Sequence, residues 1–225
     1  MANTETTINA IMQPQPNETP IDIEKTIKAL ERNKFVVHYF ETGAEAVAYL
    51  KHRIQNKCVA IGDSRTLLEI GVHDALSEVN EDITDIQRPL PGESFRDTAL
   101  RTMGRDVFLT SVNALSQTGE MVNIDGTGNR VAASLFGSQE VFFVLGVNKI
   151  TPDLASAIYR ARNVAAPLNS KKNKKSSLNP CATLDEKCYD CGSPDRICNA
   201  LTIYYKKMRN MQTMEIIIIN ESLGF

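Results

Sequence analysis

The sequence predicts an α/β fold in which a central, mostly parallel β-sheet is flanked by helices. Amphipathic helical segments alternate with short apolar segments between residues 21 and 70, as expected where crossover helices connect parallel strands. Later apolar runs, dominated by Val, Phe, Leu and Ile, are typical of strands buried inside a sheet. The chain has 225 residues, which is long enough for one well-packed domain.

The first half of the chain is predicted to alternate between helix and strand. Its first helix places Ile23, Ile27 and Leu30 on one face. Thr42 and Glu45 have the spacing of a capping box and mark the start of the second helix. The predicted elements are helices at residues 21–33, 42–53 and 63–70, with strands at 34–40 and 58–62.

The second half is predicted to add most of the sheet. Pro89, Pro91 and Gly92 break the segment 79–97, which we expect to hold a peripheral strand and a loop. A turn at Thr118–Gly119 leads into the next strand. The predicted elements are helices at residues 95–103, 126–136 and 153–164, with strands at 106–112, 121–125, 141–147 and 214–220.

Charge and composition exclude several classes of protein. A net charge of -2 and a pI near 6.0 argue against a general nucleic-acid binder. The lysine-rich run at 171–175 is interpreted as a solvated loop. Residues 1–20 are polar and contain three prolines, so we expect a disordered arm before a domain at 21–225, rather than a signal peptide. No apolar run is long enough for membrane insertion, and a cytoplasmic protein is expected.

Four of the five cysteines fall within eighteen residues, in the run CATLDEKCYDCGSPDRIC. Six, two and six residues separate them, so a central Cys-x-x-Cys pair has one further thiol on each side. In a reducing cytosol such a cluster is expected to bind metal rather than to form disulfides, because thiolates are preferred ligands of zinc and of iron–sulfur clusters. The predicted ligands are Cys181, Cys188, Cys191 and Cys198, in a loop at residues 168–198 that precedes a last helix and strand.

The identity of that metal centre stays open at this point. Structural zinc sites usually combine two close cysteine pairs, whereas this chain has one, which slightly favours an iron–sulfur cluster over zinc. A zinc ion that only organises the loop and a redox-active Cys-x-x-Cys pair are the alternatives.

A second candidate site lies at a predicted strand-to-helix junction. Gly126 and Gly128 flank Thr127 there, and backbone N–H groups at such a junction bind anions, although a tight turn without a ligand explains these glycines equally well. Polar residues at nearby strand ends favour a ligand site, because ligands bind at the carboxyl ends of parallel strands. Lys149 also follows a strand, but a surface position is expected for it. The predicted ligand-binding residues are Asp63, Ser64, Thr66, Asn113, Asn123, Asp125, Gly126, Thr127, Gly128, Asn129 and Arg130.

The sequence contains four runs that indicate a family: GDSRTLLEIGV at 62–72, TSVNALSQTGEMVNIDGTGNRVAASLFG at 110–137, VLGVNKITPDLASAIYRARNVAAPLNSKK at 144–172, and the cysteine run. Together they resemble the LUD-domain (lactate utilization) proteins over about residues 20–225. The resemblance implies a fold like that of the CoA-transferase and ribose-phosphate-isomerase superfamily. Some members form a lactate-oxidising complex in which iron–sulfur subunits pass electrons, which implies an electron-transfer protein as a partner. This chain lacks the repeated Cys-x-x-Cys-x-x-Cys pattern of the cluster-carrying subunit, so family membership does not imply lactate as its substrate.

The resemblance extends to sugar-phosphate isomerases related to translation initiation factor subunits. Those enzymes have an aspartate, then Asn-Gly-Asp, then Asn-x-x-Gly-Thr. Asn113 stands where they have their acidic catalytic residue, and an amide cannot act as a general base. The residues in register with the pattern are Asn113, Gly119, Glu120, Asn123, Gly126 and Thr127.

Three functions are compatible with these features. The leading hypothesis is a LUD-family protein of organic-acid utilization that binds a small anionic metabolite or cofactor and carries a cysteine-ligated metal centre. The second is an independent isomerase or CoA-transferase-like enzyme with Glu120 as its base or nucleophile, an idea that rests on fold analogy. The third is a scaffold protein with a purely structural zinc ion.

Overall fold

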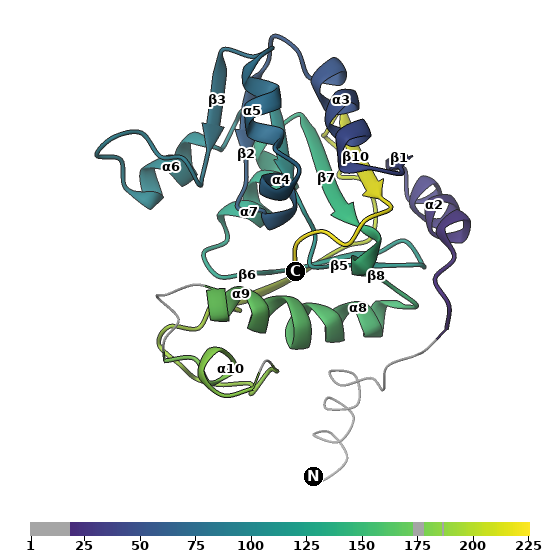
Figure 1. The fold of residues 1–225 in the computed structure, drawn as a ribbon, viewed down its shortest axis with the longest axis vertical. Helices are drawn as coiled ribbons and strands as arrows, with labels where there is room; N and C mark the ends of the chain where they lie inside the picture. Colours follow the sequence, from purple (N-terminus) through teal and green to yellow (C-terminus); the bar gives the residue numbers. More distant parts are fainter. Residues whose placement is uncertain (1–18, 173–177, 186) are drawn as a thin grey trace.

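The protein is a layered α/β structure, seen here as a computed structural model that describes residues 19–172, 178–185 and 187–225 (Figure 1). Residues 1–18 of the expected N-terminal arm lie outside the described residues, and so do residues 173–175 of the lysine-rich run. Two β-sheets form the centre, and helices cover the larger sheet and lie beneath the smaller one.

The larger sheet has six strands in the order β1-β10-β7-β4-β2-β3, and every neighbouring pair is parallel. This arrangement confirms the predicted parallel sheet. Its strands are β1 (Val36–Phe40), β2 (Cys58–Ile61), β3 (Asp82–Asp85), β4 (Val107–Thr110), β7 (Glu140–Gly146) and β10 (Thr213–Ile219).

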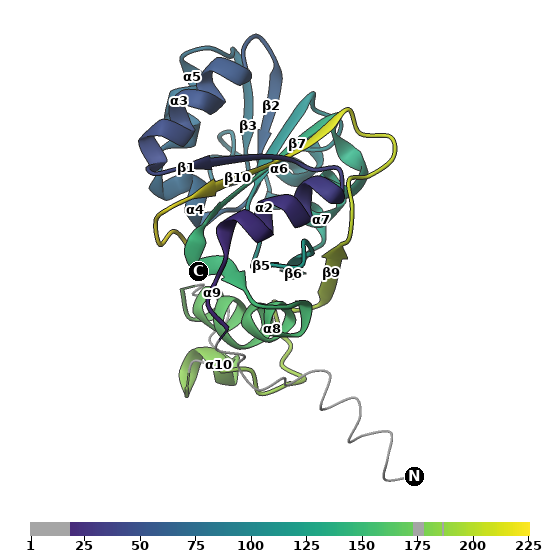
Figure 2. The same cartoon turned by 90° about the vertical axis from the view of Figure 1, so that its right-hand side faces the viewer.

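Successive residues of the central strands point to opposite faces of this sheet, as the pleat requires. In β7, Phe142 and Val144 pack with one cluster of buried side chains, and Val141, Phe143 and Leu145 pack with another. The first cluster includes residues of three helices on one face: α3 (Gly43–Arg53), α4 (Arg65–Glu69) and α5 (Val72–Ser77). The opposite face is covered by α2 (Ile23–Arg32), by α7 (Asn129–Ala132) with the π-helical turn Ala133–Gly137, and by the smaller sheet (Figure 2).

The smaller sheet has the order β8-β5-β6-β9 and mixes parallel and antiparallel pairs. Leu115 and Met121 point into the main core, whereas Ala114 and Val122 pack against α8 (Leu154–Arg160). The smaller sheet is therefore a layer between the larger sheet and α8. Its strands are β5 (Ala114–Ser116), β6 (Met121–Asp125), β8 (Ile150–Thr151) and β9 (Ala200–Tyr204).

The segment before the last strand differs from the prediction. We expected a helix there, but residues 200–204 form β9, which pairs antiparallel with β6. Thr202, Ile203 and Tyr204 favour extended backbone, and Tyr204 is fully buried against the core. Pairing with an otherwise open strand edge therefore outweighs any helical tendency of this short segment.

Helix boundaries follow local capping signals. The capping box predicted from Thr42 and Glu45 is confirmed at the start of α3. The helix predicted at 153–164 is longer, because α8 continues through a π-helical turn (Ala161–Ala165) into α9 (Ala166–Lys172). The remaining helices are α6 (Phe95–Arg101) and the short α10 (Pro180–Thr183). Among the described residues, no helix is long and apolar enough to cross a membrane.

Candidate functional site

An open cavity of about 250 Å³ lies where the ends of several strands meet. Asp63 and Ser64 follow β2, residues 111–113 follow β4, and Lys149 follows β7, so three adjacent strands of the large sheet contribute from their carboxyl ends. Residues 124–127 at the end of β6 supply another wall. This edge of a parallel sheet is the usual place for a ligand site.

Most of the predicted ligand-binding residues meet at this cavity. Thr66 and Asn123 are fully buried beside it and contact residues of its wall, and Gly128 caps α7. Those that line the cavity are Asp63, Ser64, Asn113, Asp125, Gly126, Thr127, Asn129 and Arg130.

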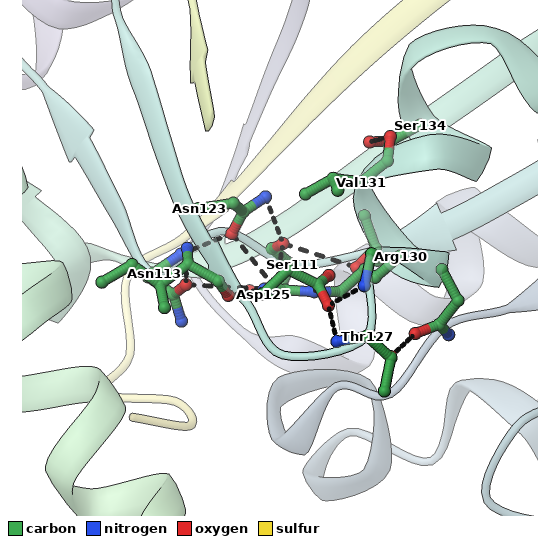
Figure 3. A network of polar contacts seen from close by, with 12 residues as sticks. Ser111, Asn113, Asn123, Asp125, Thr127, Arg130, Val131 and Ser134 are labelled. Carbon is green, nitrogen blue, oxygen red and sulfur yellow. Dashed lines mark hydrogen bonds and ion pairs between the residues drawn. The ribbon is translucent and has the colours of Figure 1, made fainter. Parts of the chain in front are cut away.

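The turn after β6 uses its backbone N–H groups internally (Figure 3). The Asp125 carboxylate accepts hydrogen bonds from the N–H groups of Thr127, at 3.1 Å, and Gly128, at 2.8 Å. Gly128 has a φ of 85°, which favours glycine, and the helix that follows has only four residues. The amides that the sequence suggested as an anion cradle are thus engaged by the protein's own carboxylate. Recognition of a ligand anion must come mainly from side chains.

Arg130 holds the end of β6 in place. Its guanidinium donates hydrogen bonds to the Asn123 side chain at 3.1 Å and to the Ile124 carbonyl at 2.6 Å, and it lies 3.5 Å from the Asp125 carboxylate (Figure 3). The side chain is mostly buried, with 13% of its surface exposed. Arg130 therefore positions the cavity wall, and Asp125 offsets part of its charge.

Lys149 is the unexpected member of the site. The sequence favoured a surface position, but the residue is buried, with 3% of its surface exposed, and it lines the cavity. Its Nζ donates to the Thr66 and Ser111 hydroxyls at 2.9 and 3.0 Å. The available signal in the sequence was its place after a wholly apolar strand, whose end was expected to meet other strand ends.

Burial changes the acid–base behaviour of this amine. Loss of hydration lowers the pKa of Lys149 from 10.5 to about 7, and the positive charges of Arg160 and Arg130 contribute, whereas Glu69 opposes the change. In the described part of the chain, no carboxylate lies within ion-pairing distance of Nζ. A buried ammonium without a counter-ion is costly, so this amine is readily deprotonated or readily paired with a ligand anion.

Arg160 extends the positive field from α8. It donates to the backbone oxygens of Asn148, at 3.1 Å, of Phe225, at 3.3 Å, and of Asn113. Burial lowers the pKa of Arg160 to about 10, which still leaves it charged at neutral pH. Arg160 thus joins the loops after β4, β7 and β10 and adds positive charge behind the cavity.

Glu120 stands apart from the cavity. It lies in the hairpin between β5 and β6, is half-buried, and accepts a hydrogen bond from the Thr118 hydroxyl. It is not among the residues that line the cavity. The structure therefore separates the proposed catalytic carboxylate from the predicted ligand-binding residues.

The four clustered cysteines are half-buried, and each is a free thiol, as is Cys58. The Cys198 sulfur lies 3.2 Å from the Arg196 guanidinium, and the Cys188 sulfur lies 3.8 Å from that of Arg162. Burial raises the pKa of Cys198, and Arg196 opposes the change. Within residues 19–172, 178–185 and 187–225, no three His, Cys, Asp or Glu side chains converge to hold a metal ion.

The end of the cysteine-rich loop nevertheless contacts the cavity. Ile197 contributes to its wall. Asn199 donates from its backbone N–H to the Asp125 carbonyl at 3.0 Å and from its side chain to the Gly126 carbonyl at 2.9 Å. The loop and the turn after β6 thus form one continuous wall, although the sequence suggested two separate sites.

Comparison with known families supports the resemblance to LUD-domain proteins that the sequence indicated. The family model of the LUD domain matches residues 23–219, which is most of the chain. The protein belongs to the LUD-domain family. No curated protein matches the chain.

The LUD-domain fold is also found in a solved structure. The crystal structure of a DUF162 family protein from Deinococcus radiodurans superimposes with a TM-score of 0.53, covering 89% of this chain and 99% of that chain. The two sequences are 13% identical, so the likeness concerns the fold. It agrees with the mixed α/β architecture and the central parallel sheet described above.

Proposed function

We propose that this LUD domain binds a small organic anion, of the kind handled in lactate and organic-acid utilization, in the cavity at the strand ends. The observation that carries the proposal is the burial of Lys149 without a carboxylate partner among the described residues, in the same cavity as Arg130. A ligand carboxylate would supply the missing counter-charge, and the Ser111 and Thr66 hydroxyls already orient the amine.

Calorimetric titration with propionate at pH 6.5 tests the proposal, with uncharged propionamide as the matched ligand. We expect propionate to bind and propionamide not to bind, because the interaction is between charges. Replacing Lys149 by Met removes the cation, and we expect at least a tenfold loss of affinity, about 1.4 kcal/mol. The exposed Lys206→Met is the matched control. Equal binding of both ligands, or full affinity in Lys149→Met, would overturn the proposal.

The alternative of a CoA-transferase-like enzyme gains less support. It requires a carboxylate nucleophile beside the bound substrate, and Glu120 does not line the cavity. We therefore favour the hypothesis of ligand binding at the Lys149 cavity over the hypothesis of catalysis by Glu120.

A cysteine-ligated zinc or iron–sulfur centre remains the second part of the proposal. Four cysteines within eighteen residues support it, and five free thiols agree with a reducing cytoplasm. Ligation would require the loop to rearrange, because the described thiols do not converge. Anaerobic purification, an absorbance spectrum and metal analysis of wild type and Cys188→Ser test it. Bound iron and sulfide would indicate a cluster and electron transfer, colourless stoichiometric zinc would indicate a structural ion, and no bound metal would exclude both.

A further inference from the structure

Lys149 has more chemical capability than anion binding requires. A tetrahedral amine nitrogen has three positions besides its bond to carbon, and two of them are directed at the Thr66 and Ser111 hydroxyls. The third carries a proton in the ammonium form and a lone pair in the neutral form. Since the residue lines the cavity, a ligand in the cavity is the available partner for that position.

The surroundings favour the neutral, nucleophilic form to an unusual degree. Lys149 is 3% exposed, and the backbone of Gly224 packs so close to its amine that a Cβ built on this glycine would lie 3.1 Å from Nζ. Together with the neighbouring guanidinium groups of Arg130 and Arg160, this burial brings the pKa of Lys149 to about 7. A desolvated lysine beside other cations is a known arrangement for attack on carbonyl carbon.

The charge of the cavity indicates which carbonyl compounds are suitable. Arg160 stays charged when Lys149 is neutral, and the Arg130 guanidinium lines the cavity, so a carboxylate on the ligand still lies in a positive field. A ligand with a carbonyl next to a carboxylate interacts with both the nucleophilic amine and the positive field of the site. An aldehyde or ketone without a negative charge uses only one.

We propose that Lys149 captures the carbonyl carbon of a small 2-oxo acid as a Schiff base in this cavity, an inference that rests on the anion site proposed above. The neutral Nζ attacks the carbonyl carbon, and the carbonyl oxygen becomes a hydroxyl as the nitrogen loses a proton. That hydroxyl then takes up a proton and leaves as water, which gives the protonated imine without any oxidant or reductant. The Ser111 and Thr66 hydroxyls are in hydrogen-bond contact with Nζ and are placed to pass these protons.

Borohydride trapping with pyruvate, the probe for this class, tests the inference. Reduction of the imine fixes the ligand on the protein, and intact-mass and peptide analysis should locate one adduct on Lys149. We expect trapping to rise with pH through about 7 as the neutral amine accumulates. Lys149→Arg keeps a cation but lacks the nucleophile, so it should form no adduct, while Lys206→Met should behave as wild type.

The outcomes separate this inference from the proposed function. Propionate has no carbonyl group, so its binding tests the anion site alone. If propionate binds but pyruvate gives no adduct on Lys149, the Schiff base is refuted and the anion site stands. If neither binds, both are refuted. Adducts spread over surface lysines in proportion to their exposure would also refute the inference.

Discussion

Replacing Lys149 by Met should change how the stability of the protein depends on pH. Burial depresses the pKa of this amine in the folded state to about 7, whereas the unfolded chain has an ordinary value of 10.5. Between these two values the unfolded state binds one more proton than the folded state does, so the stability of the wild type rises with pH across that window. Below about pH 7 the folded protein must bury a charged amine, so the free energy of unfolding is lowered by the full cost of burying that charge.

The size of the effect follows from the same two pKa values. Each pKa unit corresponds to about 1.4 kcal/mol, so the cost of burying the charge approaches ~5 kcal/mol at low pH. Unfolding is conveniently measured between pH 6 and pH 9. Over this range the linkage relation predicts that the titration of Lys149 raises the free energy of unfolding by roughly 2 to 3 kcal/mol. Met has a similar length and no charge, so the Lys149→Met variant should lack this change.

Urea unfolding of both proteins at pH 6 and pH 9 measures the effect. The free energy of unfolding of wild type, minus that of Lys149→Met, should increase by roughly 2 to 3 kcal/mol from pH 6 to pH 9. Other titrating groups are common to both proteins and cancel in this difference. The exposed Lys206→Met should show no such change relative to wild type. If the difference in the free energy of unfolding between wild type and Lys149→Met is the same at both pH values, the lowered pKa of Lys149 in the folded state is refuted.

Three further substitutions test the fold and the site. Arg53→Met leaves the buried carboxylates of Glu140 and Glu215 without the guanidinium that lies 2.6 and 3.0 Å from them, and should lower the free energy of unfolding in urea by about 3 kcal/mol. Gly119→Ala places a Cβ 2.9 Å from the backbone of α2 at a φ of 99°, and should cost about 2 kcal/mol in the same assay. Glu120→Gln should leave the affinity for propionate unchanged in calorimetry, since Glu120 does not line the cavity; a tenfold loss would show that the site extends to the hairpin.

Much of the fold was predictable because local patterns and tertiary structure agree. The Thr42–Glu45 capping box starts a helix wherever it occurs before an apolar face. Side chains along β7 and β10 alternate between two buried clusters, which follows from the pleat of a sheet covered on both faces. The smaller sheet was harder to predict from the sequence, because β8 has only two residues and because β9 pairs with β6 across more than seventy positions of sequence. Such pairings are decided by long-range contacts rather than by propensity.

The candidate site was predictable in its location and less so in its chemistry. Asp63, Asn113 and Asp125 were expected at strand ends and do line one cavity. Sequence alone does not reveal that Asp125 occupies the amides of its own turn, because that depends on side-chain direction. The expected surface position of Lys149 is wrong, because the residues that surround its amine, Thr66, Ser111 and Gly224, lie far from it in the sequence. The residue type alone does not show that a particular lysine is buried by such distant segments.

The most direct test of the account is the number of protons exchanged when propionate binds the wild-type protein at pH 8. Calorimetry in buffers of different ionisation enthalpy measures this number. With a free-state pKa of about 7, Lys149 is mostly neutral at pH 8, and a carboxylate in the cavity should draw a proton onto it. We expect uptake approaching one proton per propionate bound. Binding without proton uptake, or no binding, would contradict the claim that Lys149 is the anion-binding group of this LUD domain.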